Sequence, residues 1–206
     1  MKIAERYDGI LDAACGVFAR RGFHQASIRE IARAAGLSPA GLYHYVGGKD
    51  ELLFLVLDRS LKRLIGELDQ ALAAARTPET KLLALIRTHL EFGFRHAPAL
   101  KIINRDYELL AEPRRSEIAA RRGSYLQHGL AVLRDLDPYR RSGDELLSAT
   151  SLLLGMLNGI ATRPFVRSSN DARALAAEVG ALFLYGFLER AGGGEDAPAA
   201  ALRRPA

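Results

Sequence analysis

The residues best suited to chemistry lie between residues 38 and 49, in the stretch SPAGLYHYVGGK. Ala40, Tyr43 and His44 have the i, i+3, i+4 spacing that places side chains on one face of a helix. Tyrosine and histidine can donate hydrogen bonds to phosphate oxygens, and a small residue beside them lets a helix approach base edges closely. The pattern predicts a helix that fits the major groove of DNA. A solvated aromatic helix end is the alternative interpretation.

The residues on either side of this face have types that begin and end helices. Ser38 can cap a helix with Pro39 at its first position, where a missing N–H costs nothing. Gly47 and Gly48 then end the helix. Lys49 begins a long apolar run at a helix start, where free N–H groups also favour an anion, so we expect it to bind a phosphate.

Two further helices are predicted before this segment. Residues 10–18 place apolar side chains at helical spacing, and Gly22 ends that helix. In SIREIARAAGL, Ser27 and Glu30 have the spacing of a capping box. A short helix after Ser27, a turn at Gly36 and the helix after Ser38 make a helix-turn-helix, and the first helix completes its small core.

The whole chain reads as all-α, because prolines and glycines divide it into helical lengths and no segment alternates apolar and polar residues. We expect about nine helices. Residues 1–50 are predicted to form a three-helix helix-turn-helix domain, which a long helix joins to a helical ligand-binding and dimerisation domain at residues 51–191. The Gly-, Ala- and Pro-rich residues 192–206 are expected to be a disordered tail.

Composition narrows the possible function. The net charge of +5 suits nucleic acid or an anionic ligand without proving either. Charged residues at the N-terminus argue against a signal peptide, and the longest uncharged run, residues 146–162, is short for a membrane span, so we expect a cytoplasmic protein without membrane contact. The chain shows no phosphate loop or nucleophile elbow, and His89 and His96 have no third ligand at metal spacing. We therefore predict neither an enzyme nor a cofactor or metal site.

Residues 10–53 resemble the DNA-binding domain of the tetracycline-repressor (TetR) family of one-component transcriptional regulators. The resemblance runs from ILDAACGVFARRGF through SIREIARAAGLS to LYHY and KDELL, with Val46 at a usual Phe position and Gly48 at a usual polar cap. It implies phosphate contacts from Ser27 and Lys49 and a backbone contact from Tyr43. It also implies contacts to bases or nearby phosphates from Ser38, Pro39, Ala40 and His44, with help from Arg29 and Arg33. For each arginine, a solvated helix face is the alternative.

The larger domain resembles a subgroup of that family whose regulators often answer to acyl-CoA thioesters or related lipid metabolites. NRDYELLAEPRRSEIAARRGSYLQHGLAVL contains an Arg-x-x-Glu pattern at Arg105 and Glu108, and LLLGMLNGIATRPF resembles the eighth helix without its usual aromatic residues. The resemblance and the nearby apolar residues predict a repressor released from DNA by an anionic, largely apolar metabolite such as an acyl-CoA. The candidate ligand-binding residues are Phe92, Arg105, Arg121, Tyr125, Asn158 and Arg163.

Two alternatives to that effector remain open at this point. A cationic or neutral drug-like ligand would suit the aromatic and acidic residues Glu91, Phe92, Phe94, Asp106 and Glu108. An effector-free DNA-binding protein would instead have a filled core in its larger domain.

A homodimer on a near-palindromic operator is expected, because one short recognition helix reads few base pairs. The helix at residues 146–162 and the segment ALAAEVGALFLYGFLER have more apolar residues than one buried side requires, so we expect two copies to pair in a four-helix interface. The small residues Gly155, Gly159 and Gly180 are predicted to allow close contact there. Arginine at Leu153 or Leu182 should then give monomers.

Overall fold

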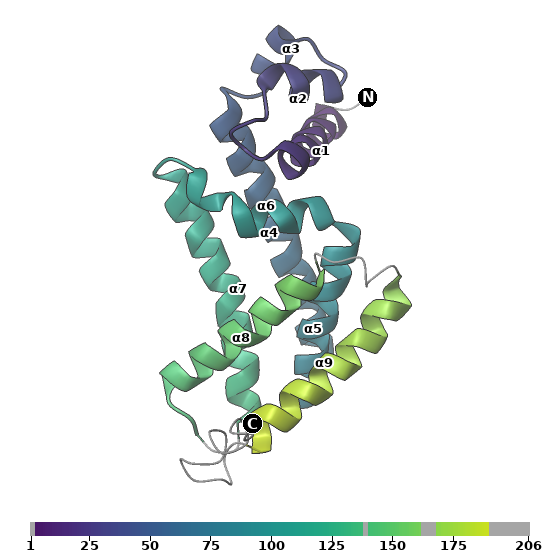
Figure 1. The fold of residues 1–206 in the computed structure, drawn as a ribbon, viewed down its shortest axis with the longest axis vertical. Coiled ribbons are helices and arrows are strands. Elements are labelled where there is room, and N and C mark those ends of the chain that lie inside the picture. The colour runs from purple at the N-terminus through teal and green to yellow at the C-terminus, as the bar shows by residue number, and fades with distance from the viewer. Residues whose placement is uncertain (1–2, 138–139, 162–167, 190–206) are drawn as a thin grey trace, which may run out of the picture.

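The structure is a computed structural model that describes residues 3–137, 140–161 and 168–189. Its described residues form nine α-helices and one short 3₁₀ helix (Figure 1), as the sequence predicted. The elements are α1 (Ile3–Arg21), α2 (Ile28–Ala34), α3 (Pro39–Tyr43), α4 (Lys49–Ala74), α5 (Pro78–Arg95), α6 (Ala97–Arg105), η1 (Tyr107–Leu109), α7 (Arg114–Leu136), α8 (Gly143–Ala161) and α9 (Ser169–Glu189). The expected tail at residues 192–206 lies outside the described residues.

Helices α1 to α3 form a head at one end of the molecule (Figure 1). Ser27 caps α2 as predicted, because its hydroxyl oxygen accepts a hydrogen bond from the Glu30 N–H at 3.1 Å. The Glu30 carboxylate pairs with Arg21 Nε at 3.3 Å, which ties α2 to the end of α1. The predicted cap is therefore present, and the acidic partner of the capping box is used for a contact between helices.

The turn between α2 and α3 depends on one glycine. Gly36 has φ +65°, a conformation that glycine adopts without a steric penalty. Its N–H bonds to the Arg33 carbonyl at 3.1 Å, and the Leu37 N–H bonds to the Ala32 carbonyl at 2.8 Å, which is the Schellman arrangement. Ser38 then caps α3 through the Gly41 N–H at 3.0 Å. The head therefore has the helix-turn-helix geometry that its sequence predicted.

Helix α4 runs from the head into the larger bundle and contributes to both hydrophobic cores. Buried residues of its first half, within residues 52–61, belong to one core with α1 to α3 and α6, while Leu64 and Leu68 belong to a second core with α5, α7, α8 and α9. The packing of the head thus continues beyond residue 50, where the sequence suggested a domain boundary.

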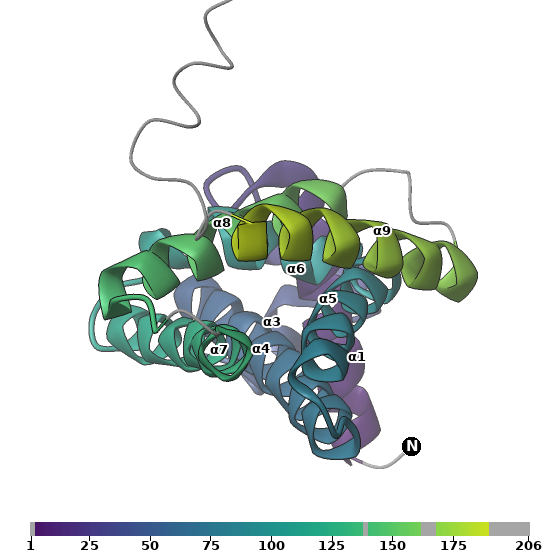
Figure 2. The same ribbon diagram turned by 90° about the horizontal axis from the view of Figure 1, so that it is seen from below.

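The lower bundle is built from α5 and α7 beside α4, with α8 and α9 along one side (Figure 2). Close approach depends on two glycines of different helices. A Cβ at Gly93 of α5 would clash with the Ala161 Cβ, and one at Gly180 of α9 would meet Leu83 at 2.7 Å. Gly180 therefore faces α5 inside the protomer, so its predicted place in an intersubunit contact is wrong. None of the helices in the described residues is long and apolar enough to cross a membrane.

Candidate nucleic-acid interface

Helix α3 has one buried side and one free side, as the spacing of its residues predicted. Leu42 is fully buried in the head, and Val46 just beyond the helix is 3% exposed. Ala40 and His44 are exposed, and the Tyr43 side chain is 55% exposed. The face that could enter a groove thus carries side chains that the head does not need for its core.

Residues at the starts of α2 and α3 are also exposed. Ser38 and Pro39 are exposed at the start of α3, and Ser27 and Arg29 are exposed at the start of α2. The oxygens of Ser27 and Ser38 already accept backbone hydrogen bonds, but each hydroxyl keeps its proton for donation. These two helix starts therefore offer donors to phosphate groups.

Lys49 has a structural role that the sequence did not predict. Its Nζ donates to the carbonyls of Ala26 at 3.1 Å and His24 at 3.3 Å and lies 4.6 Å from the centre of the Phe23 ring. The ammonium therefore ties the start of α4 to the loop between α1 and α2. Because an ammonium has three N–H donors, one remains for a phosphate.

The predicted ligand-binding arginines hold helices together in this structure. Arg105 pairs with Asp106 through Nε at 2.5 Å, and its Nη2 donates to the Phe18 carbonyl of α1 at 2.8 Å. Arg121 of α7 pairs with Asp58 of α4. Both guanidinium groups are thus engaged with the protein itself, Arg105 at the junction with the head. Arg163 lies outside the described residues.

Tyr125 and Asn158 are brought together by a histidine that the sequence analysis considered only as a metal ligand. Tyr125 Oη and His89 Nδ1 form a buried hydrogen bond of 2.8 Å. Asn158 Oδ1 accepts from Asn104 Nδ2 at 2.9 Å, and the Asn158 side chain also acts on His89. Burial lowers the pKa of His89 to about 4, against the smaller opposing effect of Asn158, and raises the pKa of Tyr125. The larger domain therefore contains a neutral polar cluster in its core.

Phe92 lies apart from this cluster. It is 1% exposed and lines a pocket at the junction of α1, α4, α5 and α6, together with side chains that the sequence analysis did not select. The six predicted ligand-binding residues therefore do not converge on one cavity in the described residues. Asp8 and Asp12 of α1 both pair with Arg59 at the junction. Their i, i+4 spacing, which places them on one face of the helix, is the one sequence pattern among the described residues that indicates this junction.

Residues 10–56 match the family described as bacterial regulatory proteins, tetR family. These residues belong to the TetR family. The chain is similar to a curated relative, the HTH-type transcriptional regulator BetI of Brucella canis, with 36% identity over 77 residues. That match covers 37% of this chain and 39% of the BetI sequence, so the chain spans less than half the length of this relative. The family consists of regulators, which agrees with the prediction that the chain is not an enzyme.

Two solved structures extend the similarity to the whole TetR fold. A TetR-family transcriptional regulator from Bordetella parapertussis 12822 aligns with a TM-score of 0.82 and 28% identity, covering 89% of this chain and 96% of that one. AibR, solved in complex with isovaleryl coenzyme A and operator DNA, aligns with a TM-score of 0.75 and 24% identity, covering 86% and 98%. The second likeness concerns the fold alone.

The neutral state of His89 predicts a pH dependence of stability. Because its pKa is about 4 in the fold against 6.5 as the ordinary value, the unfolded chain binds the proton more readily, and the free energy of unfolding should fall as pH drops from 6.5 towards 4. The loss should be on the order of 3 kcal/mol. Urea unfolding at a series of pH values measures it. His89→Gln should flatten the curve, whereas Tyr125→Phe should keep its slope, since burial is the main cause. An equal slope in His89→Gln would contradict this interpretation.

Proposed function

We propose that this protein is a homodimeric transcriptional regulator of the cytoplasm that binds a near-palindromic DNA operator through α2 and α3. The observation that carries the proposal is the exposed face of α3, held by a helix-turn-helix inside the segment that matches the family. Ala40 and His44 would face bases, and Tyr43 would contact the DNA backbone. Ser27, Ser38 and Lys49 would donate to phosphates, with Pro39 close to the groove and Arg29 assisting.

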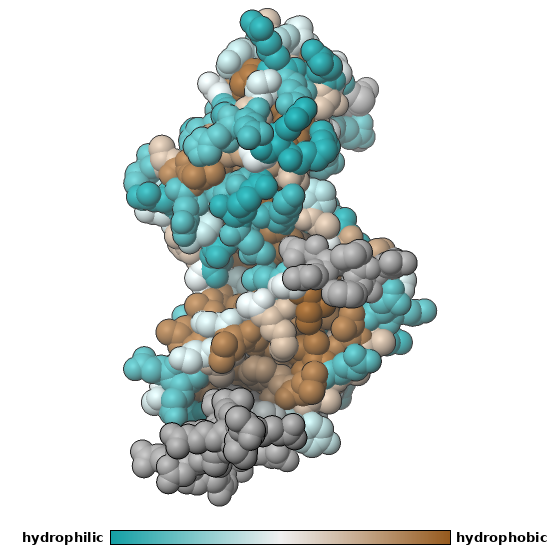
Figure 3. Space-filling model, in the orientation of Figure 1, coloured by the Kyte–Doolittle hydropathy of each residue, from teal (hydrophilic) through white to brown (hydrophobic). Residues whose placement is uncertain are grey.

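The dimer proposal rests on an apolar surface over α8 and α9 (Figure 3). Leu152 and Leu182 are 70% and 71% exposed, and Tyr185 is 68% exposed, which is unusual for three large side chains on two adjacent helices. Gly155 and Gly159 have open space above them, so another helix could approach closely. Leu153, in contrast, is fully buried in its own protomer, so it is the wrong residue with which to test the interface.

For the effector, we propose an anionic, largely apolar metabolite with an acyl-CoA as the leading candidate. AibR has isovaleryl coenzyme A bound in a chain of the same fold, which supports the class by analogy. Within this chain, Tyr125 and Asn158 supply polar groups in an apolar interior, whereas Phe92 lines a separate pocket. The ligand would release DNA by preferring a spacing of the two heads that no longer fits successive major grooves.

Substitutions in the head test DNA binding. Tyr43→Phe should weaken operator binding by about tenfold, because it removes a donor to a charged phosphate. Lys49→Ala should lower the slope of log affinity against log salt by roughly 1 if its ammonium neutralises one phosphate group of the operator. Mobility shifts with the protein's own promoter at several salt concentrations measure both effects.

Lys101→Ala, which removes a cation from the exposed side of α6, is the matched control. Thermal melts should accompany Lys49→Ala, since this residue also ties α4 to the loop before α2. An unchanged salt slope together with a lower melting temperature would assign Lys49 a structural role only. Failure of the wild-type protein to shift its promoter would contradict the regulator proposal.

Charge substitutions on α8 and α9 test the dimer. Leu152→Arg and Leu182→Arg should give monomers in sedimentation velocity, because each would bury an unpaired charge in the interface. Leu109→Arg, at an exposed leucine of η1, should leave the dimer intact. An intact dimer in both interface variants would move the contact to another surface.

Titration of the protein–operator complex tests the effector class. Acyl-CoAs should release the operator and raise the melting temperature of the protein, whereas the matching free acids should act more weakly because they lack the phosphates. Release by a cationic dye alone would favour a drug-responsive regulator. No release by any of the three would favour an effector-free DNA-binding protein.

A further inference from the structure

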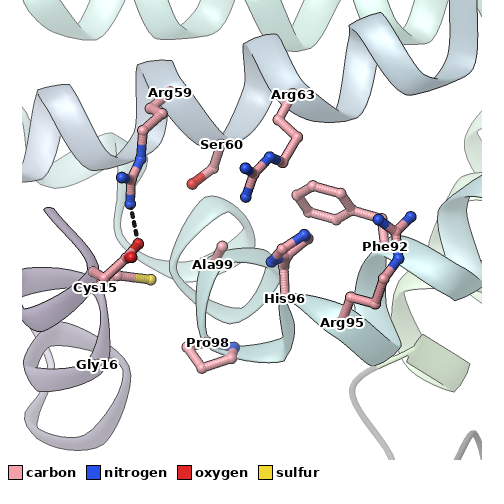
Figure 4. Close-up of a pocket in the computed structure, with 11 residues that line it drawn as sticks. Cys15, Gly16, Arg59, Ser60, Arg63, Phe92, Arg95, His96, Pro98 and Ala99 are labelled. Carbon is pink, nitrogen blue, oxygen red and sulfur yellow. Dashed lines mark hydrogen bonds and ion pairs between the residues drawn. The ribbon is translucent and has the colours of Figure 1, made fainter. Parts of the chain in front are cut away.

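The pocket at the junction of α1, α4, α5 and α6 has walls from both parts of the molecule (Figure 4). Helix α1 contributes Asp12, Cys15 and Gly16, and α4 contributes Arg59, Ser60 and Arg63. The remaining wall consists of Phe92, Arg95 and His96 with Pro98 and Ala99 of α6. A molecule in this pocket would therefore touch the head, the long connecting helix and the lower bundle at once.

Most charges that line this pocket are already neutralised. Arg59 forms ion pairs with Asp8 at 3.1 Å and with Asp12 at 2.5 Å. Asp12 is the only carboxylate among the lining residues, so Arg59 neutralises it. Arg95 forms a two-point pair with Glu67, at 3.2 and 2.7 Å. Since these pairs join α4 to α1 and to α5, their groups serve the fold.

Arg63 and His96 are the basic side chains of the pocket that take no part in these ion pairs. Within the described residues, neither the Arg63 guanidinium nor the His96 ring makes a hydrogen bond or an ion pair. Figure 4 shows them extending towards one another from α4 and from the end of α5. The His96 ring is fixed by contact with the Phe92 ring, their centres 4.9 Å apart. A guanidinium and an imidazole with no acceptor thus face a common space.

Two further features favour an anion in that space. Helix α6 begins beside it, with no side chain capping its N-terminus and with Pro98 and Ala99 in its first turn, so the positive end of the helix dipole lies at the pocket. Burial, followed by the charges of Arg63 and Arg95, lowers the pKa of His96, while Glu67 and Asp12 act in the opposite direction. Arg63 thus supplies the positive charge at this pocket that no ion pair within the described residues neutralises.

The size of the pocket limits what it can hold. Its volume of about 180 Å³ is smaller than the roughly 300 Å³ at which sites for drug-sized ligands begin, and far larger than a single water requires. An entire acyl-CoA does not fit. A compact anion with a few oxygen acceptors does, and a planar guanidinium binds such groups through two parallel hydrogen bonds.

We propose that this junction pocket binds a compact oxyanion, the phosphate or carboxylate group of a small metabolite, between Arg63 and His96. The anion accepts hydrogen bonds from both side chains and holds α4 against the start of α6. Because the walls include α1, occupancy stabilises the arrangement of head and bundle seen here. Any consequence for operator affinity rests on the proposed function, whereas anion binding itself is measured on the protein alone.

The test uses inorganic phosphate and acetate as probes, with chloride at matched ionic strength as the screening control. Binding is followed by calorimetry and by the NMR signal of the His96 ring, which His96→Gln identifies by its loss. At least one oxyanion should bind saturably and raise the pKa of His96. A response to phosphate identifies a phosphate site, and a response to acetate alone identifies a carboxylate site.

Arg63→Gln should weaken this binding at least tenfold, because it removes a charged hydrogen-bonding partner. Lys62→Gln is the matched control, since it removes the same charge from the neighbouring residue of α4, whose ammonium pairs with Asp58 at 2.7 Å outside the pocket. His96→Gln should also weaken binding, as measured by calorimetry. Equal affinity in Arg63→Gln and Lys62→Gln, or the same response to chloride, would overturn the proposal.

Discussion

The sharing of α4 between two hydrophobic cores is the constraint on which the rest of the structure depends. Leu57 and Leu61 are buried with the head, and Leu64 and Leu68 are buried with the lower bundle, one turn further along. A continuous helix cannot change its direction in one core without moving its side chains in the other. The ion pair of Arg59 with Asp8 of α1 and the hydrogen bond that Arg105 donates to the Phe18 carbonyl add polar links at the same level. Helix α4 therefore joins the two parts as one mechanical unit.

The head could be predicted from sequence because its structure is set by local chemistry. Ser27 and Ser38 cap helices, Gly36 supplies the positive φ of the turn, and the spacing of Leu42 and Val46 marks the buried side of α3. Each of these signals involves residues within a few positions of one another. The same reasoning missed the contacts of Lys49 with carbonyls more than twenty residues away, since no local pattern encodes them.

The larger domain was less predictable because its polar residues find partners across the fold. Arginine is a residue type that often binds anionic ligands, which is why Arg105 and Arg121 were selected. In the packed structure Arg105 binds Asp106 and the distant Phe18 carbonyl, and Arg121 binds the distant Asp58. Leu152 and Leu153 show the same limit of sequence-based prediction for two neighbouring residues. Both lie in an apolar run, and only the packed helix shows that Leu152 is exposed and Leu153 buried.

The division of α3 into a buried and an exposed side has a consequence for how such a protein can diversify. Leu42 and Val46 anchor the helix, while Ala40, Tyr43 and His44 contribute little to the core. Surface substitutions of this kind usually change stability by less than about 0.5 kcal/mol. Under the proposed DNA-binding role of α3, substitutions at these positions would alter recognition without disturbing the helical bundle at the other end of the molecule.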